Sequence, residues 1–262
     1  MQALRTAATG MAAQQMNVEV ISNNIANMNT VAFKRQRAEF QDLLYQTFQA
    51  AGTQSSDQGT IVPTGVQVGG GVKASAVYRI GTQGSLTRTD NQYDVAINGR
   101  GYLQVLTPSG DNAYTRAGNL SVNDQGQLVT QDGYQIQPAI TVPADAVSVS
   151  ISKTGQVEVI QAGQTNPSVV GVLELATFMN DGGLEAIGDN LLKETAASGA
   201  PTTGTPGSVG IGTLVQGYTE ASNVDAVAEI TALIVAQRAY EMNSKVISTA
   251  DNMLATANQV KA

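Results

Sequence analysis

The chain has 262 residues, of which 42% are hydrophobic and only 13% charged, and its net charge is −7. This size allows one large or two ordinary domains with a buried core. Because 14 Lys and Arg stand against 21 Asp and Glu, binding of nucleic acid through its phosphates is not expected. Cys and His are absent, which excludes a disulfide framework, a thiolate zinc site and a Ser-His-Asp triad.

The sequence has no segment that resembles a membrane span, which needs about 20 apolar residues. The N-terminus also lacks the pattern of a cleavable signal, because Gln2, Gln14, Gln15 and Asn17 interrupt its apolar residues and Arg5 is its only early charge. We therefore expect a cytosolic protein, or one that is exported without such a signal.

Residues 1–28 predict a helix with a coiled-coil-like apolar stripe. Four large apolar side chains are seven residues apart, and three more follow at a spacing of three: Leu4, Met11, Val18 and Ile25, then Ala7, Ile21 and Met28. An ordinary amphipathic helix that packs on its own domain is the alternative. A helix on a membrane surface is disfavoured because the polar face lacks lysines.

Residues 224–257 contain no Gly or Pro and predict a second, longer helix. Its large apolar residues are again seven apart, at Leu233, Tyr240, Ile247 and Leu254. Ser222 or Asn223 offers an N-cap. Such a helix would be about 50 Å long, which is too long for one small domain to cover.

Between the two helices the hydrophobic pattern alternates, as in strands, and Gly- and Asn-containing turns separate the segments. The pattern predicts strands at 93–99, 101–106, 113–122, 127–134, 147–152, 156–160 and 169–178. Short strands of this kind predict an all-β domain of about 100 residues, an irregular sandwich or barrel. The fold class is therefore α+β.

Two stretches rich in Gly and small polar residues, 46–74 and 197–213, match neither pattern. A flexible linker is the simplest interpretation of both. Because the first is long for an idle loop, it is a candidate for a functional or intersubunit segment.

Candidate catalytic residues are scarce. Asp181, Glu185 and Asp189 are four apart, so a helical turn could place them on one face. A solvated face is favoured over an acid-base or metal site, because three glycines within this stretch disfavour a stiff helix. We expect no enzyme activity, no catalytic residue, no metal and no cofactor.

The two ends also carry recognisable motifs. The segment "SNNIANMNTVAFKR" (22–35) resembles the N-terminal signature of the flagellar axial proteins, the rod and hook family. The segment that begins "EASNVDAVAEI" and ends "STADNML" (220–254) is similar to the family's C-terminal signature, and "DVAINGRGYLQV" matches between them. Residues 51–74 resemble the stretch that separates the distal rod branch from hook proteins. Proximal rod and hook-type subunits are the alternatives within the family.

The resemblance implies a structural subunit that self-assembles into the rigid, hollow, helical drive shaft of the basal body. The shaft would transmit torque from motor to hook and serve as the export channel. Its location would be the rod that crosses the periplasm, reached through the flagellar type III system. The implied partners are further copies of the chain, proximal rod proteins, hook protein, and P-ring and L-ring proteins, with no nucleic acid and no membrane insertion.

The resemblance also implies a domain plan. Residues 1–34 with 224–262 would form a terminal helical core with coiled-coil-like pairing, and residues 90–196 an outer β-domain. An extended linker layer would comprise 35–89, including the 46–74 segment, and 197–223. A different class of protein remains open, in which a glycan-binding or enzymatic β-domain carries helical oligomerisation arms.

The site predictions follow from incomplete burial: one subunit alone is not expected to cover both apolar helix faces. Intersubunit helix packing is predicted for Leu4, Met11, Val18, Ile21, Ile25, Leu233, Tyr240, Ile247 and Leu254. Amide contacts at the helix end are predicted for Asn23, Asn24, Asn27 and Asn29. A rod-stiffening role is predicted for Gly52, Ser55, Ser56 and Pro63.

Overall fold

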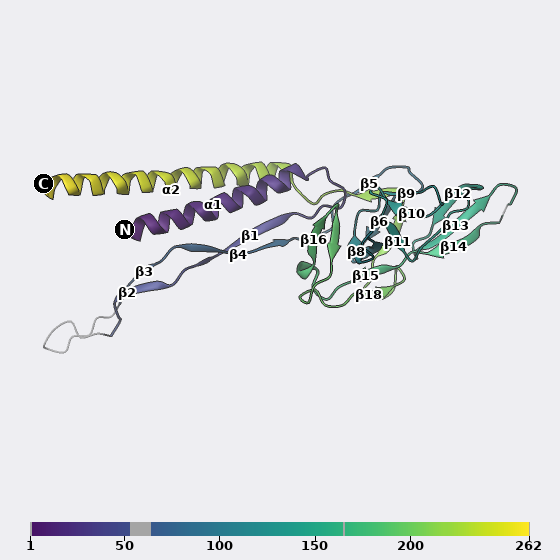
Figure 1. Cartoon of the computed structure of the whole chain (residues 1–262), viewed down its shortest axis with the longest axis horizontal. Coiled ribbons are helices and arrows are strands. Elements are labelled where there is room, and N and C mark those ends of the chain that lie inside the picture. The colour runs from purple at the N-terminus through teal and green to yellow at the C-terminus, as the bar shows by residue number, and fades with distance from the viewer. Residues whose placement is uncertain (1, 53–63, 165, 262) are drawn as a thin grey trace. The chain divides into compact units, whose positions relative to one another are not determined.

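A computed structural model describes residues 2–52, 64–164 and 166–261. It confirms an α+β chain with N- and C-terminal helices and a central β-rich part (Figure 1). The chain forms two compact units. Unit 1 comprises Met1–Ala26, Gln36–Tyr78 and Asp225–Ala262, and unit 2 comprises Asn27–Arg35 and Arg79–Val224. No helix within the described ranges is both long and apolar enough to cross a membrane.

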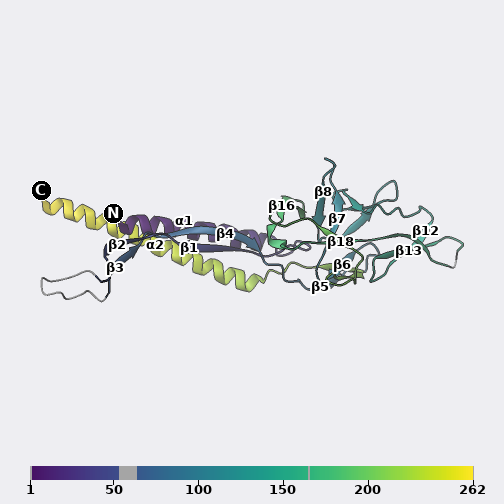
Figure 2. The ribbon, with the colours of Figure 1, turned by 90° about the horizontal axis from the view of Figure 1, so that it is seen from below.

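Unit 1 contains two helices, α1 (Gln2–Ala26) and α2 (Ala226–Lys261), which lie side by side and run in opposite directions (Figures 1 and 2). The predicted N-cap of the second helix was wrong. Asp225 caps α2, because its Oδ1 accepts hydrogen bonds from the backbone N–H groups of Val227 at 2.9 Å and Ala228 at 3.2 Å. Ser222 and Asn223 precede the cap and have other partners.

The helix pair has a defined register. Near the end of α1, the Asn24 amide donates to the Glu229 carboxylate of α2 at 3.1 Å. Fourteen residues earlier on α1, Gly10 lies against Asn243 of α2, and a Cβ atom on this glycine would be 3.0 Å from the Asn243 amide nitrogen. The two contacts are fourteen residues apart on both helices, so α1 and α2 keep the same relative register between them.

Unit 1 also contains strands that the sequence did not predict. β1 (Gln36–Asp42) pairs with β4 (Val72–Arg79). β2 (Tyr45–Gln49) pairs antiparallel with β3 (Val66–Gly69), which places much of the unassigned 46–74 segment in a two-stranded ribbon. Alternation was hard to read here because both faces of these strands are largely exposed.

The described part of unit 2 is built mainly on a nine-stranded sheet. Seven strands follow one another in the order β16 (Glu185–Gly188), β17 (Leu191–Lys193), β8 (Asn112–Thr115), β7 (Tyr102–Leu106), β11 (Gln135–Gln137), β10 (Leu128–Thr130) and β9 (Leu120–Val122). The neighbouring strands of this path pair antiparallel. The sheet branches at β7, which also pairs with β15 (Leu175–Thr177), and β15 in turn pairs with β18 (Thr202–Gly204).

Smaller sheets complete unit 2. One has three strands, β12 (Ala146–Ile151), β13 (Gln156–Gln161) and β14 (Ser168–Val172). Two have two strands each, β6 (Val95–Asn98) with β19 (Thr213–Gln216), and β5 (Leu86–Arg88) with β20 (Tyr218–Glu220). Residues 197–213, which the composition suggested to be a linker, contribute β18 and the start of β19 to these sheets.

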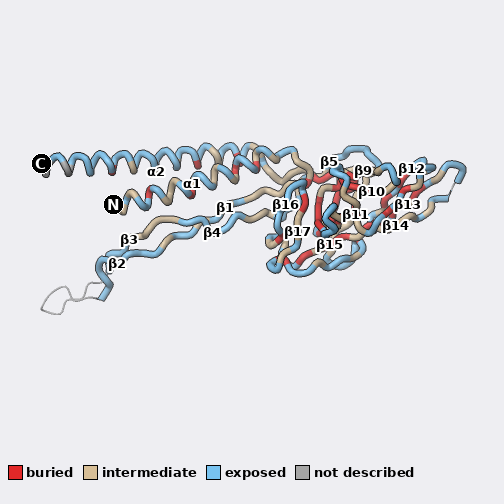
Figure 3. The backbone as a smooth tube through the Cα atoms, in the orientation of Figure 1, coloured by how far each residue is buried: buried red, intermediate tan, exposed pale blue. Residues whose placement is uncertain are grey.

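The sheets of unit 2 share one hydrophobic core, seen as the buried segments of Figure 3. Ile97, Leu103, Val157 and Leu175, which come from four different strands, are each 0% exposed. A second cluster joins Tyr114, Ala176, Phe178 and Leu184. The tyrosine and phenylalanine rings meet edge to face at 4.8 Å.

Several predicted strand boundaries were wrong. The stretch 113–122 is split into β8 and β9, because the chain leaves the sheet after Thr115 and then passes close to Val95, where a Cβ atom on Gly118 would collide with the Val95 carbonyl oxygen. The stretch 127–134 ends as a strand at Thr130, where the chain turns through Gly133 with φ +86°. The stretch 169–178 is split into β14 and β15.

The three spaced carboxylates do not share a helix face. Asp181 begins the 3-10 helix η1 (Asp181–Gly183), Glu185 begins β16, and Asp189 lies in a turn with φ +50°. Asp181 pairs with Arg100 at 3.3 Å, and Asp189 accepts a hydrogen bond from the Tyr134 hydroxyl at 3.1 Å. A shared helix face, which the three glycines already disfavoured, is therefore not formed.

Candidate functional site

Within one chain, the predicted helix-packing residues are only partly covered. Ile21 is buried, whereas Tyr240 is 42% and Leu254 39% exposed. The other six are partly buried: Leu4, Met11, Val18, Ile25, Leu233 and Ile247. The fully buried apolar positions of α1 and α2 are mostly small, with Ala7 and Ala13 on α1 and Ala236 and Ala250 on α2. The helices therefore bury little large apolar surface against each other.

A stripe of large apolar residues on α2 stays exposed. It consists of Val235, Met242, Val246 and Met253, whose exposed fractions are 63%, 63%, 47% and 62%. Their spacing of seven, four and seven residues places them on one helix face. We call these four residues the α2 stripe. Its only signal in the sequence was that residues flanking the predicted seam are also apolar.

A groove of about 720 Å³ lies beside the N-terminal end of this stripe, at Val235. Gln14 and Asn17 of α1 form one wall, and the other wall is α2, with small side chains at Ala228, Ala232 and Ala239. Small residues let another backbone approach closely, so this face of the helix pair is shaped for packing.

Asn24 forms a buried junction within unit 1. Its side chain is 1% exposed. The Oδ1 atom accepts a hydrogen bond from the Gln36 N–H at 2.8 Å, and Nδ2 donates to the Gln36 carbonyl at 2.8 Å and to Glu229 at 3.1 Å. One amide thus ties the end of α1 to the start of β1 and to the first turn of α2. This pairing uses both the donor and the acceptor of the amide.

The other predicted amides lie differently. The Asn27 side-chain oxygen accepts a hydrogen bond from the Thr30 hydroxyl at 3.0 Å, within the turn that follows α1. Asn23 and Asn29 are exposed. The sequence therefore marked four similar residues, of which Asn24 is the one with a buried structural role in this chain.

The β2–β3 ribbon exposes apolar side chains. Phe48 is 66%, Val66 50% and Val68 41% exposed. Gly52, near the end of the ribbon, is exposed with φ +86°. The predicted stiffening residues Ser55, Ser56 and Pro63 lie outside the described residues. A two-stranded ribbon without a covered face is marginally stable alone.

The ribbon is held to α1 at its other end. Gly71, just before β4, has φ +120° and touches Thr9, so closely that a Cβ atom there would overlap the Thr9 hydroxyl oxygen. The same oxygen accepts a hydrogen bond from the Val72 N–H at 3.3 Å. The glycine run 69–71 therefore provides a close contact between this segment and α1.

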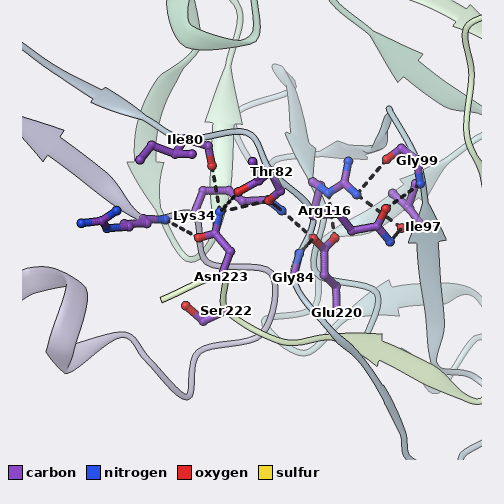
Figure 4. Close-up of polar contacts among 12 residues, drawn as sticks. Lys34, Ile80, Thr82, Gly84, Ile97, Gly99, Arg116, Glu220, Ser222 and Asn223 are labelled. Atoms are coloured by element: carbon purple, nitrogen blue, oxygen red, sulfur yellow. Dashed lines mark hydrogen bonds and ion pairs between the residues drawn. The ribbon is translucent and has the colours of Figure 1, made fainter. Parts of the chain in front are cut away.

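A second polar junction, in unit 2, joins segments next to three places where the chain passes between the units. We call it the connector clasp; it comprises Lys34, Thr82, Gly84, Arg116, Glu220 and Asn223 (Figure 4). The Glu220 side chain is 0% exposed. It accepts hydrogen bonds from Lys34 Nζ at 2.5 Å, Arg116 Nε at 2.8 Å and the Gly84 N–H at 2.9 Å.

Asn223 completes the clasp. Its Oδ1 accepts a hydrogen bond from the Arg35 N–H at 2.7 Å, and its Nδ2 donates to the carbonyl oxygens of Ile80 at 2.9 Å and Thr82 at 3.0 Å. The amide therefore joins its own segment to the backbones of two others, at Arg35 and at Ile80 and Thr82. The Lys34 ammonium also donates to the Thr82 carbonyl at 2.9 Å.

In the clasp, two cations, Lys34 and Arg116, pair with the single carboxylate of Glu220, and they affect its pKa. Burial alone would raise the pKa of Glu220, but Arg116, Lys34 and the Gly84 N–H together lower it. The pKa of Lys34 is also lowered, chiefly by burial, which outweighs the effect of Glu220. A Lys that pairs with a Glu usually has a raised pKa. For Lys34, burial and the positive charge of Arg116 together outweigh the effect of Glu220 and lower the pKa.

These junctions bring together the two terminal motifs of the sequence, and known families match the same regions. A family described as "Flagella basal body rod protein" matches residues 4–34, and one described as "Flagellar basal body rod FlgEFG protein C-terminal" matches residues 215–260. The clasp bonds Lys34, in the first match, to Glu220, in the second. A third family, "Flagellar hook protein FlgE/F/G D1 domain", matches residues 96–159 of unit 2.

Relatives that align over the whole chain identify its family. The flagellar basal-body rod protein FlgG of Caulobacter vibrioides is 69% identical over 262 residues, which is all of both chains. The chain belongs to the flagellar basal-body rod protein family. Within this family, FlgG of Bacillus subtilis is 40% identical over 97% of each chain. FlgF of Caulobacter vibrioides is 35% identical over 88% of this chain and 85% of its own.

The comparison separates two branches of the rod protein family. Against two proteins of one organism, identity is 69% to FlgG and 35% to FlgF. The chain is therefore similar to FlgG, which confirms both the family resemblance found in the terminal motifs and the distal rod resemblance found in residues 51–74. Among the residues that the structure describes, no group of three or more acidic side chains is placed to hold a metal ion.

Proposed function

We propose that this rod protein is a structural subunit of the flagellar distal rod and polymerises with copies of itself into a rigid, hollow, helical shaft. The shaft transmits torque from motor to hook and encloses the export channel. One observation carries the proposal beyond family membership: the α2 stripe exposes four large apolar residues on one face of a helix. Such a face is unfavourable in water and favourable once another helix covers it.

The helix pair supplies the tube's core in this proposal. The constant register over fourteen residues corresponds to two heptads, as expected for coiled-coil-like packing. Burial of one large apolar side chain contributes about 1.5–3 kcal/mol. Four such residues per copy would contribute about 6–12 kcal/mol to association once a neighbouring copy covers them. The predicted residues Tyr240 and Leu254, exposed in one chain, would be covered in the same lattice.

The β2–β3 ribbon braces the shaft. Its exposed Phe48, Val66 and Val68 would rest on a neighbouring copy, while Gly71 and Thr9 hold the other end to α1. A ribbon fixed at both ends restrains relative movement of the two copies. This would stiffen the rod, as predicted for the 46–74 segment with Gly52, Ser55, Ser56 and Pro63.

In the polymer, terminal helices would line the centre, an extended linker layer would surround them, and the β-domain of residues 90–196 would face outward as an irregular sandwich or barrel. Proximal rod proteins, hook protein and the P-ring and L-ring proteins would be its neighbours in the basal body. Export would use the flagellar type III system. No catalytic step is assigned to the chain, because packing alone accounts for this role.

The test is polymerisation of the full chain. Replacement of Val235 and Met242 by Asp places two charges on the α2 stripe, where a covering helix would have to desolvate them. We expect no pelletable polymer from this variant in sedimentation, with the circular dichroism of the folded chain unchanged. The matched control Ser248→Asp adds a charge to an exposed polar position of α2 and should polymerise. Normal polymer from the double variant would refute the assignment of the stripe.

A further inference from the structure

A small pocket in unit 2, next to the connector clasp, has a charge opposite to that of its surroundings. Its volume is about 220 Å³, and it is lined by Lys34, Gln83, Arg100, Tyr102, Arg116 and Asp181 together with glycines. Over residues 27–35 and 79–224, 13 Asp and Glu stand against 8 Lys and Arg. Three cationic side chains nevertheless converge on this pocket with one carboxylate in its lining.

Around the pocket, cationic side chains outnumber carboxylates. Glu220, which bonds two of the lining cations, and Asp181 are the carboxylates at hand. A fourth cation, Arg79, is close enough to Tyr102 to affect the pKa of its hydroxyl. Burial and Asp181 raise this pKa, whereas Arg116, Arg79 and Arg100 act to lower it. Arg79 donates to the Leu184 carbonyl, and none of the described carboxylates lies within ion-pair distance of it. Burial lowers the pKa of this guanidinium, as expected for a cation without a counter-ion.

Hydrogen-bond donors also remain available at the pocket. Arg100 uses only Nη2, which donates to the Phe178 carbonyl at 3.0 Å and to Asp181 at 3.3 Å. The Tyr102 hydroxyl donates to no residue in the described ranges, although its ring is fixed edge to face on Phe178. Glycines at 81, 99 and 101 leave part of the wall without side chains. The pocket thus offers donors, positive charge and space for a small planar anion.

We propose that this pocket binds the carboxylate of an Asp or Glu side chain from a second copy of the chain, held by Arg100 and the Tyr102 hydroxyl. The inference rests on the proposed polymer and names one of its contacts. A carboxylate fits because a guanidinium binds it through parallel N–H donors and a phenol adds a third. A second copy is the source because each copy carries an excess of exposed acids, so a helical lattice must set unlike charges against each other.

The first experiment measures the critical concentration for polymerisation of the full chain by sedimentation. The combined variant R100Q and Y102F removes the charge and the hydroxyl but keeps the ring on Phe178. Loss of charge-assisted hydrogen bonds is expected to raise the critical concentration about tenfold. The control R88Q, in an ion pair whose side chains are 69% and 71% exposed, should leave it within about twofold. An unchanged value in the pocket variant overturns the inference.

The second experiment identifies the source of the carboxylate. The variant R100K places an amine at the pocket, and a carbodiimide then joins amines to carboxylates in direct contact. Polymer is made from mixed 14N- and 15N-labelled copies, and mass spectrometry shows whether each link is within or between copies. A link from position 100 to an acid of a different copy supports the inference. If position 100 is linked only to Asp181 of the same copy, the inference is overturned.

A variant-free measurement guards against loss of folding. Sodium acetate at constant ionic strength should raise the wild-type critical concentration relative to chloride, since acetate competes for a carboxylate site. No difference between the two salts speaks against the pocket. If the wild-type chain forms no polymer at all, the proposed function fails and this contact fails with it. If polymer forms but the pocket variants and acetate have no effect, only this inference fails.

Discussion

Units 1 and 2 differ in which apolar side chains they bury. In unit 2, large residues such as Leu103, Val157 and Leu175 are 0% exposed in a core shared by several sheets. In the helix pair of unit 1, alanines are buried while Val235 and Met253 are more than 60% exposed. Unit 2 therefore has a large apolar core within one chain, whereas the helix pair of unit 1 leaves large apolar side chains exposed.

Each unit also buries one carboxylate beside its connecting segments, with different partners. Glu220 in unit 2 faces two cations, Lys34 and Arg116. Glu229 in unit 1 is 1% exposed and accepts a hydrogen bond from the neutral Asn24 amide. The clasp in unit 2 thus contains two ion pairs, and the Asn24 amide in unit 1 joins α1 to α2. The predictions below act on this contrast.

The largest expected effect is in the clasp. Glu220→Ala leaves two cations buried without their carboxylate, which costs about 3–5 kcal/mol for a broken buried pair. Urea unfolding followed by hydrogen exchange of the β7 and β13 amides of unit 2 should show this loss. The matched control Arg88→Ala breaks an exposed ion pair with Asp90 and should cost less than about 1 kcal/mol. Equal losses in both variants would contradict a special role for the clasp.

A smaller loss is expected at the helix junction. Asn24→Ala removes three hydrogen bonds and leaves the partly buried N–H and carbonyl of Gln36 without the Asn24 side chain, at about 2–3 kcal/mol. Helical circular dichroism should report the loss, while hydrogen exchange of the β7 and β13 amides in unit 2 hardly changes. The exposed Asn29→Ala serves as control, with an effect within about 0.5 kcal/mol. A fall in unit 2 stability of the same size would show that the units are not distinct in this respect.

A smaller effect again is expected where the ribbon meets α1. Gly71→Ala adds a Cβ atom against Thr9 at a backbone φ of +120°, a conformation that costs a residue with a side chain about 1–2 kcal/mol. Proteolysis at the β2–β3 ribbon should become faster. Gly133→Ala, in a turn of unit 2 with φ +86° and open space around it, controls for backbone strain alone. Faster ribbon cleavage in both variants would remove the special role of the Thr9 contact.

The smallest effect near neutral pH is the pH dependence of unit 2. Because the folded pKa of Glu220 is lowered, its stabilising contribution is fully present above the ordinary Glu pKa of about 4.3. It is lost as the pH falls through the lower folded pKa. Stability should therefore be flat from pH 7 to 5 and decline below. Glu220→Gln should remove part of this decline, and an unaltered decline would assign it to other carboxylates.

Periodicity found the helices, because heptad spacing persists from Leu4 to Ile25 and from Leu233 to Leu254. It also found strands with one buried face, such as β7 and β13. It failed where both faces are exposed, as in β2, and where a strand ends inside an alternating stretch, as after Thr115. The α-helical cap was misplaced by two or three residues because Ser222, Asn223 and Asp225 are all good caps.

The polar junctions were the hardest to predict. Asn24 and Asn223 stand in the terminal motifs, so the resemblance marked them, but their partners at Gln36, Ile80 and Thr82 are backbone groups without a residue signature. Glu220 and Arg116 are 104 residues apart, and nothing in either local sequence indicates their pairing. Only the fold brings such groups together.

Hydrogen exchange of the full chain, compared between monomer and polymer, tests the central claim most directly. Amides of α2 around Val235, Met242 and Met253 should gain strong protection only in the polymer, because another copy then covers the stripe. Amides of β7 and β13 in unit 2 should be equally protected in both states. Protection of α2 that is already as strong in the monomer as in the polymer would contradict the account, since the helix pair would then be complete within a single chain.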